Sequence, residues 1–500
     1  MSMRRKKLKW NGQKFVMTTI EDKNDDNNGK DDEELPTLEK LLHIFGENVD
    51  LKHIRLYDEK LHFLFFTTLI DSKKFHDDLL NPLGILSYEE AVIWIKRKDI
   101  KRLTSVKKAT NAITMGSVVI FIENEAFSVP LFGPDKRGIE RSETEGVIIG
   151  AHDAFVEDAE TNLSLIRRRI KSPKLKIISL KVGEISKNDV FLLYIEDIAS
   201  KEIVEELKKR ILSIEVDTVN DADMLAQLID ENPDSVFPQY FNTELPDVVR
   251  SKLVAGKVAL ILEGSPVALT APASFFEFIQ SPDDYNQRWA IGTSLRILRI
   301  LAIFITVTFT SFYVAFITYH YEVLPEDLLL TLAESRTKVP FPPVIEAVLM
   351  ELTIELLREA GARLPTKIGQ TIGVVGGIVI GQAAVEAGFT SNILIIAVAI
   401  SAISSFVLPS YNMSNAVRII RFGLIVLAGM LGLFGIMIGL ALTLIHVVSL
   451  TSLNTPYFVP VSPLYVKEWR DVFVRGPYWA MKRRPVQTNT RNRVRQHMKK

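Results

Sequence analysis

The sequence predicts a multi-domain protein, in which an N-terminal α/β soluble region of two subdomains precedes an all-α polytopic membrane domain. About the first 287 residues mix polar and apolar positions, whereas apolar stretches dominate from Arg288 almost to Pro463. One of these stretches, Leu295 to Tyr319, is long enough to cross a hydrocarbon core of about 30 Å, which takes about 20 apolar residues. The function therefore has to join a soluble part to a membrane part.

Charge and cysteine content narrow the function classes. The 500 residues include 60 Lys and Arg and 60 Asp and Glu, and this balance gives no overall attraction to nucleic acid. The opening segment MSMRRKKLKW is not followed by the apolar run of a signal peptide, so we expect a cytoplasmic N-terminal domain. The chain lacks cysteine, which excludes disulfides and thiolate chemistry. No Walker, GxSxG or HExxH motif is present, so we expect no enzyme, cofactor or metal site.

The soluble region is predicted in three parts. Residues 1–34 form a disordered charged leader, because the run EDKNDDNNGKDDEE contains no apolar residue. Residues 35–135 form subdomain 1, with a helix in LPTLEKLLHIFG, a buried strand in LHFLFFTTLI, and two strands in SVVIFIENEAFSVPLF. A Gly- and charge-rich break, FGPDKRGIERSETEG, leads into subdomain 2, residues 136–287, where strand-like and helix-like segments alternate.

The membrane domain is predicted over residues 288–463, followed by a basic cytoplasmic tail over 464–500. Apolar runs predict four spans, at about 295–319, 368–387, 392–408 and 420–448. The last run is longer than a perpendicular crossing requires, so we expect it to tilt or to extend along the interface.

Basic residues predict the orientation of the spans. Arg288, Arg296 and Arg299 place the start of the first span inside. The part of the tail after Asp471 contains basic residues but no acidic residue, so it places the C-terminus inside as well. An even number of crossings follows, so a further Glu-rich segment over about 343–360 should be re-entrant or interfacial. Arg418 and Arg421 oppose this model, because it places them outside.

The Glu-rich segment carries an acidic stripe on a helix. Glu351, Glu355 and Glu359 recur every four residues, and an apolar stripe occupies another face. Since carboxylates in hydrocarbon cost several kcal/mol each, the acidic stripe must face water, a cavity, or basic partners such as Arg358 and Arg363. An amphipathic helix in the headgroup region is the alternative.

A glycine ladder follows at four-residue spacing, formed by Gly369, Gly373, Gly377 and Gly381. GxxxG steps let helix backbones approach closely in a membrane. Ordinary packing within one chain is one reading. A contact between subunits, or the lining of a narrow path, is the other, and the nearby polar residues Gln370, Gln382 and Glu386 favour it. A second pair, Gly435 and Gly439, is expected only to pack.

Four long strings together resemble one known family. They are TNLSLIRRRIKSPKLK, EGSPVALTAPASFFEFIQSPDDYNQRW, the run from ISSFVLPSYNMSNAVRIIRFG to VPVSP, and DVFVRGPYWAMKRRP. The resemblance is to the A subunit of GerA-type spore germinant receptors, and it covers subdomain 2, the membrane domain and the tail. The leader and subdomain 1 match in layout but less by string.

The resemblance implies a multi-pass protein of the spore inner membrane that works with a transporter-like B subunit and a lipoprotein C subunit. It implies that copies of the chain oligomerise into a ligand-gated channel for monovalent cations during nutrient-triggered germination. A ring of identical acidic helices would offer such a path a cation lining. The alternatives are a non-conducting scaffold and an accessory sporulation protein of the same family. A secondary transporter is disfavoured, because the spans show no internal repeat.

Overall fold

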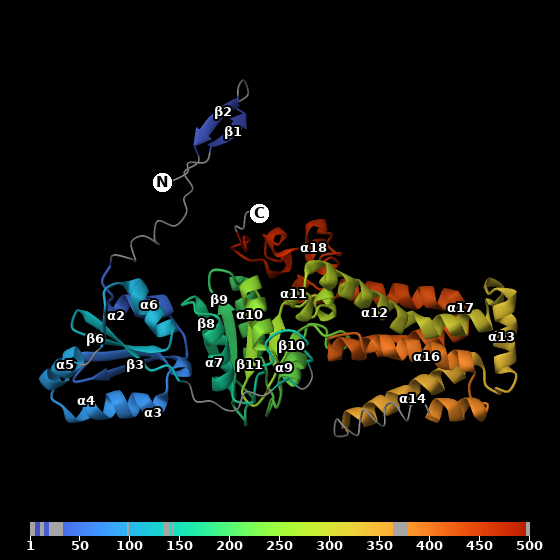
Figure 1. The fold of residues 1–500 in the computed structure, drawn as a ribbon, viewed down its shortest axis with the longest axis horizontal. Helices are drawn as coiled ribbons and strands as arrows, with labels where there is room; N and C mark the ends of the chain where they lie inside the picture. The colour runs from blue at the N-terminus through green and yellow to red at the C-terminus, as the bar shows by residue number, and fades with distance from the viewer. Residues whose placement is uncertain are drawn as a thin grey trace. The chain divides into compact units, whose positions relative to one another are not determined.

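The computed structural model describes residues 6–10, 15–19, 34–97, 100–133, 141–142, 145–363 and 379–496 (Figure 1). It divides into two compact units. The first comprises Met1–Lys136 with Ile170–Lys176, and the second comprises Arg137–Arg169 with Ile177–Lys500. Two five-stranded antiparallel sheets precede a set of long helices. The predicted fold class, an α/β region followed by an all-α region, is therefore confirmed.

Two short strands lie inside the predicted leader. β1 (Lys6–Trp10) and β2 (Phe15–Thr19) pair antiparallel, with Trp10 opposite Phe15. The prediction of a disordered leader did not include this hairpin. The most charged part of the leader, residues 20–33, lies outside the described residues.

The first unit contains a sheet with the strand order β3-β4-β6-β7-β5. The strands are β3 (Leu51–Leu56), β4 (Leu61–Phe66), β5 (Lys101–Leu103), β6 (Ser117–Ile122) and β7 (Glu125–Pro130). The helices are α2 (Leu38–Phe45), η1 (Thr67–Leu69), α3 (Ser72–Phe75), η2 (His76–Leu80), α4 (Asn81–Ile85), α5 (Tyr88–Arg97) and α6 (Val106–Thr114). The predicted helix over 35–46 and the two strands over 117–132 are present, whereas the strand predicted over 61–70 ends at Phe66 and is followed by η1.

Strand β4 is buried on both faces, which explains why its sequence is a continuous apolar run. Leu61 and Phe63 pack in a core with residues of α3, η2, α4 and α5, while Leu64 and Phe66 pack in a second core with residues of α2 and α6. Successive side chains of a strand point to opposite faces, so a strand covered on both sides is apolar at every position.

The second unit contains a sheet with the strand order β10-β12-β11-β9-β8. The strands are β8 (Leu175–Val182), β9 (Asn188–Ile195), β10 (Phe241–Thr243), β11 (Val258–Leu262) and β12 (Ala268–Ala271). Helices α8 (Lys201–Leu212) and α9 (Ala222–Ile229) share one apolar core with the sheet. Helices α7 (Ala159–Arg169) and α10 (Pro246–Ala255) contact each other and β11.

The helical region of the second unit begins directly after this sheet. Its elements are η3 (Phe275–Ile279), α11 (Asp283–Asn286), α12 (Trp289–Thr318), η4 (Tyr321–Val323), α13 (Glu326–Arg336), α14 (Pro343–Arg363), a helix over 379–386, α16 (Asn392–Ser405) and α17 (Tyr411–Ser449). Helix α12 packs against α14, α16 and α17 (Figure 1). Among the helices that the structure describes, α12 and α17 are long and apolar enough to cross a membrane.

Helix α17 is broken at Gly432, whose φ of 63° and ψ of −140° are not helical. Two residues at the end of α12 form hydrogen bonds to the backbone on either side of Gly432. Tyr319 Oη donates to the carbonyl oxygens of Gly429 and Met430, at 3.1 and 2.9 Å, and His320 Nε2 accepts from the Leu433 amide at 3.2 Å. Backbone groups that the break frees from the helix are thus satisfied, as an apolar environment requires.

The two arms of α17 lie antiparallel. A Cβ added to Gly435 would collide with the Leu427 carbonyl, and one added to Gly439 would collide with the Leu424 side chain. In a straight helix these pairs would be about 12 and 22 Å apart. The structure therefore differs from the single tilted span predicted over 420–448: it makes a helical hairpin with Gly432 at the tip. Gly435 and Gly439 pack the arms together, as expected of them.

The C-terminal segment folds onto the α/β part of the second unit. Its short elements are β13 (Thr451–Ser452), β14 (Thr455–Pro456), η5 (Val466–Glu468), α18 (Trp469–Val472), η6 (Tyr478–Ala480) and η7 (Val486–Thr488). Arg484 Nε donates to the Val254 carbonyl at 2.9 Å, and Gln487 Nε2 donates to the Ala273 carbonyl at 2.8 Å. The predicted tail is thus anchored by specific hydrogen bonds.

Candidate functional site in the helical region

The acidic stripe lies on α14, which contacts α12, α16 and α17. Glu351, at its centre, is fully buried. Its carboxylate accepts a hydrogen bond of 2.8 Å from Thr310 Oγ1 of α12 and lies 2.9 Å from Arg421 Nη2 of α17. The carboxylate thus joins three helices.

Glu355, one turn further along α14, also pairs with arginines of α17. Its Oε2 lies 2.6 Å from Arg418 Nη1, and its Oε1 lies 2.9 Å from Arg421 Nη2 and 3.5 Å from Arg358 Nη1. We call Glu351, Glu355, Arg358, Arg418 and Arg421 the α14–α17 charge cluster. Two carboxylates face three guanidinium groups, so the cluster carries a formal net charge of about +1.

Serines of α16 complete the α14–α17 charge cluster. Arg421 Nη1 donates to Ser401 Oγ at 3.2 Å, and Arg358 Nη2 donates to Ser405 Oγ at 2.7 Å. Of the surroundings allowed for the acidic stripe, the structure therefore gives basic partners to Glu351 and Glu355. Arg358 was expected among them. Arg418 and Arg421 were not, although their position in an apolar run was the signal, since a buried arginine needs an anion.

Glu359 differs from the other two stripe residues. It is exposed, and its only ion pair in the described structure is with Arg363 of the same helix, at 2.5 Å. Exposed pairs four residues apart on a helix stabilise it by only a few tenths of a kcal/mol. Glu359 is thus available to another molecule or to water.

Glu346 is a buried carboxylate that sequence reasoning missed. It lies near the start of α14, 3.0 Å from Arg336 Nη2 of α13, and it accepts from the Ser391 amide at 3.2 Å. It therefore ties the start of α14 to α13 and to the N-cap of α16. Its position outside the four-residue spacing of the stripe hid it.

The other predicted path and packing residues divide into two groups. Gln382 and Glu386 are exposed on the 379–386 helix, where Gln382 Nε2 donates to Glu386 Oε1 at 2.9 Å. Gly381, on the same helix, is buried beside Ile395 of α16. The remaining predicted residues, Gly369, Gln370, Gly373 and Gly377, lie outside the described residues.

A match to a family model covers residues 39–487 and is described as the Bacillus/Clostridium GerA spore germination protein. The chain belongs to the GerA family of spore germination proteins. Spore germination protein GerQA of Bacillus cereus is 40% identical over 472 residues, which is 93% of this chain and 95% of that protein.

Two further proteins are similar to this chain, one by sequence and one with a solved structure. A protein of Bacillus subtilis, strain 168, named uncharacterized membrane protein YfkQ, is 37% identical over 426 residues, 83% of each chain. The N-terminal domain of the A subunit of the Bacillus megaterium spore germinant receptor GerK3 has a solved structure. It is 25% identical, covers 48% of this chain and 94% of that one, and superimposes with a TM-score of 0.36.

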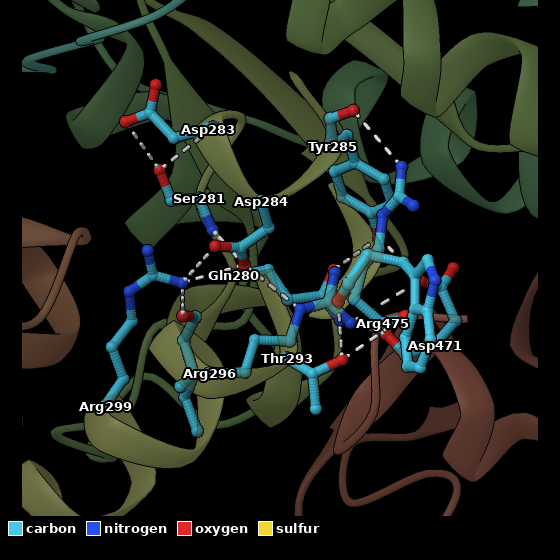
Figure 2. A network of polar contacts seen from close by, with 12 residues as sticks. Gln280, Ser281, Asp283, Asp284, Tyr285, Thr293, Arg296, Arg299, Asp471 and Arg475 are labelled. Atoms are coloured by element: carbon cyan, nitrogen blue, oxygen red, sulfur yellow. Dashed lines mark hydrogen bonds and ion pairs between the residues drawn. The ribbon is translucent and has the colours of Figure 1, made fainter. Parts of the chain in front are cut away.

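In this GerA family member, a second buried network joins α11, the start of α12 and the C-terminal segment (Figure 2). Asp284 of α11 is fully buried. Both of its carboxylate oxygens lie 2.8 Å from Arg299 Nη1, and one lies 3.0 Å from Arg296 Nε. Arg296 also donates to the Asp471 carbonyl, so the three segments meet at these side chains.

Tyr285 and Asp283 extend this network. Tyr285 Oη donates to Asp471 Oδ1 at 2.9 Å, and burial raises the pKa of this phenol, which keeps it a donor. Asp283 accepts from the amides of Ile148 and Ile149, at 3.2 and 3.0 Å. We call Asp283, Asp284, Tyr285, Arg296, Arg299 and Asp471 the junction network.

The junction network gives two arginines of the orientation prediction a structural role. In the sequence, Arg296 and Arg299, with Arg288, place the start of the first span on the inner side of a membrane. Both are buried and both pair with Asp284, and Arg296 also lies 3.5 Å from Asp471 Oδ1. They therefore say little about orientation by themselves, because the positive-inside rule concerns cations in the loops that flank a span.

Proposed function

We propose that the chain is the A subunit of a nutrient germinant receptor in the spore inner membrane. Copies of it oligomerise there into a ligand-gated monovalent-cation channel that triggers germination, together with a transporter-like B subunit and a lipoprotein C subunit. Membership of the GerA family supports the germination role. The apolar helices α12 and α17 support membrane residence. No catalytic role, cofactor or nucleic-acid partner is proposed.

The observation that carries the channel proposal is the exposure of polar residues on helices of the apolar region. Glu359, Gln382 and Glu386 are exposed and anionic or polar, whereas Glu351 and Glu355 are already paired with arginines. A cation path between copies needs oxygen ligands that replace water. We therefore propose that the exposed three line the path, with Gln370, and that Glu351 and Glu355 hold its wall. The ladder from Gly369 to Gly381 is proposed to form the contact between helices.

The placement of the ends of the helical region supports a common side for both termini. Near its start, α12 binds Asp471 of the C-terminal segment, and His446 near the end of α17 lies 2.9 Å from Ser235 of the α/β part. The first and last membrane helices thus end beside the same domain. We propose that the N-terminal domain and the tail are both cytoplasmic.

A non-conducting scaffold is the second candidate, and the arginine partners of Glu351 and Glu355 favour it. An acidic stripe neutralised within one chain gives a passing cation nothing to bind. In that case the charge cluster would only stabilise the helices, and the receptor would pass ions elsewhere.

One experiment separates the two candidates. Glu359→Gln and Glu386→Gln are compared with Glu351→Gln in spores, and the amount of the protein and the germinant-triggered release of potassium are measured together. The channel proposal expects normal amounts and reduced release for the first two variants, and a reduced amount for the third. Normal release at normal amounts for Glu359→Gln and Glu386→Gln would contradict the proposed path.

A further inference from the structure

The C-terminal segment presents a compact group of cations on a short antiparallel ribbon. Residues 482–484 pair with 493–495: the Arg484 amide donates to the Arg493 carbonyl at 3.0 Å, and the Arg495 amide donates to the Lys482 carbonyl at 2.9 Å. Five exposed basic residues lie on the two paired segments and on the loop that joins them: Lys482, Arg483, Arg491, Arg493 and Arg495. The ribbon concentrates their positive charge in a small area.

Arg484 holds the ribbon in a defined conformation through hydrogen bonds of its buried side chain. Its guanidinium turns inward, 9% exposed, and donates to the carbonyl oxygens of Val254, Asn492 and Val494 at 2.9, 2.7 and 2.7 Å. This side chain fastens the ribbon to α10 and closes its connection. The neighbouring cations are therefore held outward.

The outward cations form no ion pair within the described part of the chain. No carboxylate there lies within 4 Å of Lys482, Arg483, Arg491, Arg493 or Arg495. Asp471, on which Arg495 acts electrostatically, is already bonded to Arg296 and Tyr285. Five like charges held together repel one another, and an external anion would relieve that repulsion.

The same C-terminal segment carries three exposed aromatic side chains. Trp469 is 39% exposed, Tyr478 50% and Trp479 43%. Tryptophan and tyrosine are enriched where a protein meets the boundary between headgroups and hydrocarbon, because one end of each ring is apolar and the other polar. Clusters of four to eight cations beside a membrane helix bind anionic lipid.

The junction network places this segment beside the entry of α12. Asp471 binds Arg296, and the Arg475 carbonyl accepts from Thr293 Oγ1 at 3.4 Å (Figure 2). Thr293 and Arg296 lie in the first two turns of α12. If α12 crosses the membrane, residues 469–479 lie at the level of the headgroups.

We propose that the C-terminal segment is a lipid-binding surface, in which the ribbon cations bind anionic phospholipid headgroups and the exposed aromatics insert at the boundary. The proposal rests on the membrane residence proposed above but not on ion conduction. An acidic protein partner is the competing occupant. The aromatics and the position beside α12 favour lipid.

The test uses the full chain, which has no native cysteine, in lipid nanodiscs. A fluorophore on Val494→Cys reports proximity to headgroup-spin-labelled lipid, in discs of neutral phosphatidylcholine or of the same lipid with phosphatidylglycerol. We expect stronger quenching with the anionic lipid than with the neutral lipid at about 0.05 M salt. This difference should disappear when the salt is raised to about 0.5 M. Arg483→Gln, Arg493→Gln and Arg495→Gln together should remove at least about half of it.

A control variant carries the same charge change elsewhere. Lys187→Gln, Lys201→Gln and Lys209→Gln are exposed positions of the α/β part, and their combination should leave quenching unchanged. Equal quenching in neutral and anionic discs, or an unchanged signal in the ribbon variant, would overturn the proposal and favour a protein partner. A fluorophore on Phe304→Cys, an exposed position in α12, is quenched by acyl-chain labels only if that helix is inserted. Failure of membrane residence is therefore distinguishable.

Discussion

Glu351 of α14 and Arg421 of α17 form an ion pair from which water is excluded on both sides, with 2.9 Å between Glu351 Oε2 and Arg421 Nη2. Desolvating both groups opposes the gain from their attraction, so such a pair contributes little net stability. The pair instead makes the packing of α14 on α17 specific, because separating the two helices would leave a buried charge without its partner.

The first prediction concerns this pair. Arg421→Met should leave the Glu351 carboxylate buried with Thr310 as its remaining partner, and should lower the free energy of unfolding by about 3 to 5 kcal/mol. The double variant Arg421→Met, Glu351→Leu should recover part of that loss, because no bare charge remains at Glu351. Thermal unfolding in detergent measures both. The exposed Glu359→Gln serves as the control and should cost less than about 0.5 kcal/mol.

The second prediction concerns the junction network. Asp284→Asn keeps the shape of the side chain but removes the anion shared by Arg296 and Arg299, and should destabilise the protein by about 3 kcal/mol. The C-terminal segment should then become accessible to protease, since Arg296 helps to hold it. Asp247→Asn, at a half-buried ion-paired position outside this network, should leave cleavage unchanged. Normal protection of the tail in Asp284→Asn would show that other contacts suffice.

The third prediction tests the hairpin of α17. Cysteines at Leu424 and Gly439 should form a disulfide under mild oxidation, because the two positions touch in the hairpin. In a straight helix they would be about 22 Å apart, far beyond the reach of a disulfide. A pair at Ile419 and Phe434 has the same separation in sequence but lies on exposed faces, and should not cross-link. Non-reducing electrophoresis reads both pairs, and cross-linking of neither would favour a continuous helix.

The fourth prediction concerns Asp230, at the end of α9. Burial, with the charge of Glu231, raises the pKa of this carboxyl from 3.8 to about 7. The folded state therefore holds a proton that the unfolded state has released, so stability falls as pH rises between these two values. Asp230→Asn should remove that dependence and stabilise the protein above pH 7 by at most about 4 kcal/mol.

Unfolding of the full chain as a function of pH measures this effect. The exposed Asp234→Asn provides a control at a neighbouring position. A parallel pH dependence in the wild type and in Asp230→Asn would contradict the assignment.

The sequence by itself determined the order of the parts and the character of most elements. Strand β4 and helix α12 were recognisable, because an apolar run or a helical period depends on burial and not on which partner provides it. The four-residue spacing of Glu351, Glu355 and Glu359 likewise showed that they share one face of a helix. The family strings added the relationship to germination proteins.

Only the tertiary structure decided which groups meet. Arg418 and Arg421 opposed the predicted topology, and the sequence did not show that they pair with Glu351 and Glu355, about 65 residues away in the chain. The turn at Gly432 was hidden, because both arms are apolar and a glycine inside such a run is common in membrane helices. Periodicity records the face that a residue occupies, whereas charge pairing and chain reversal depend on the neighbour that packs on that face.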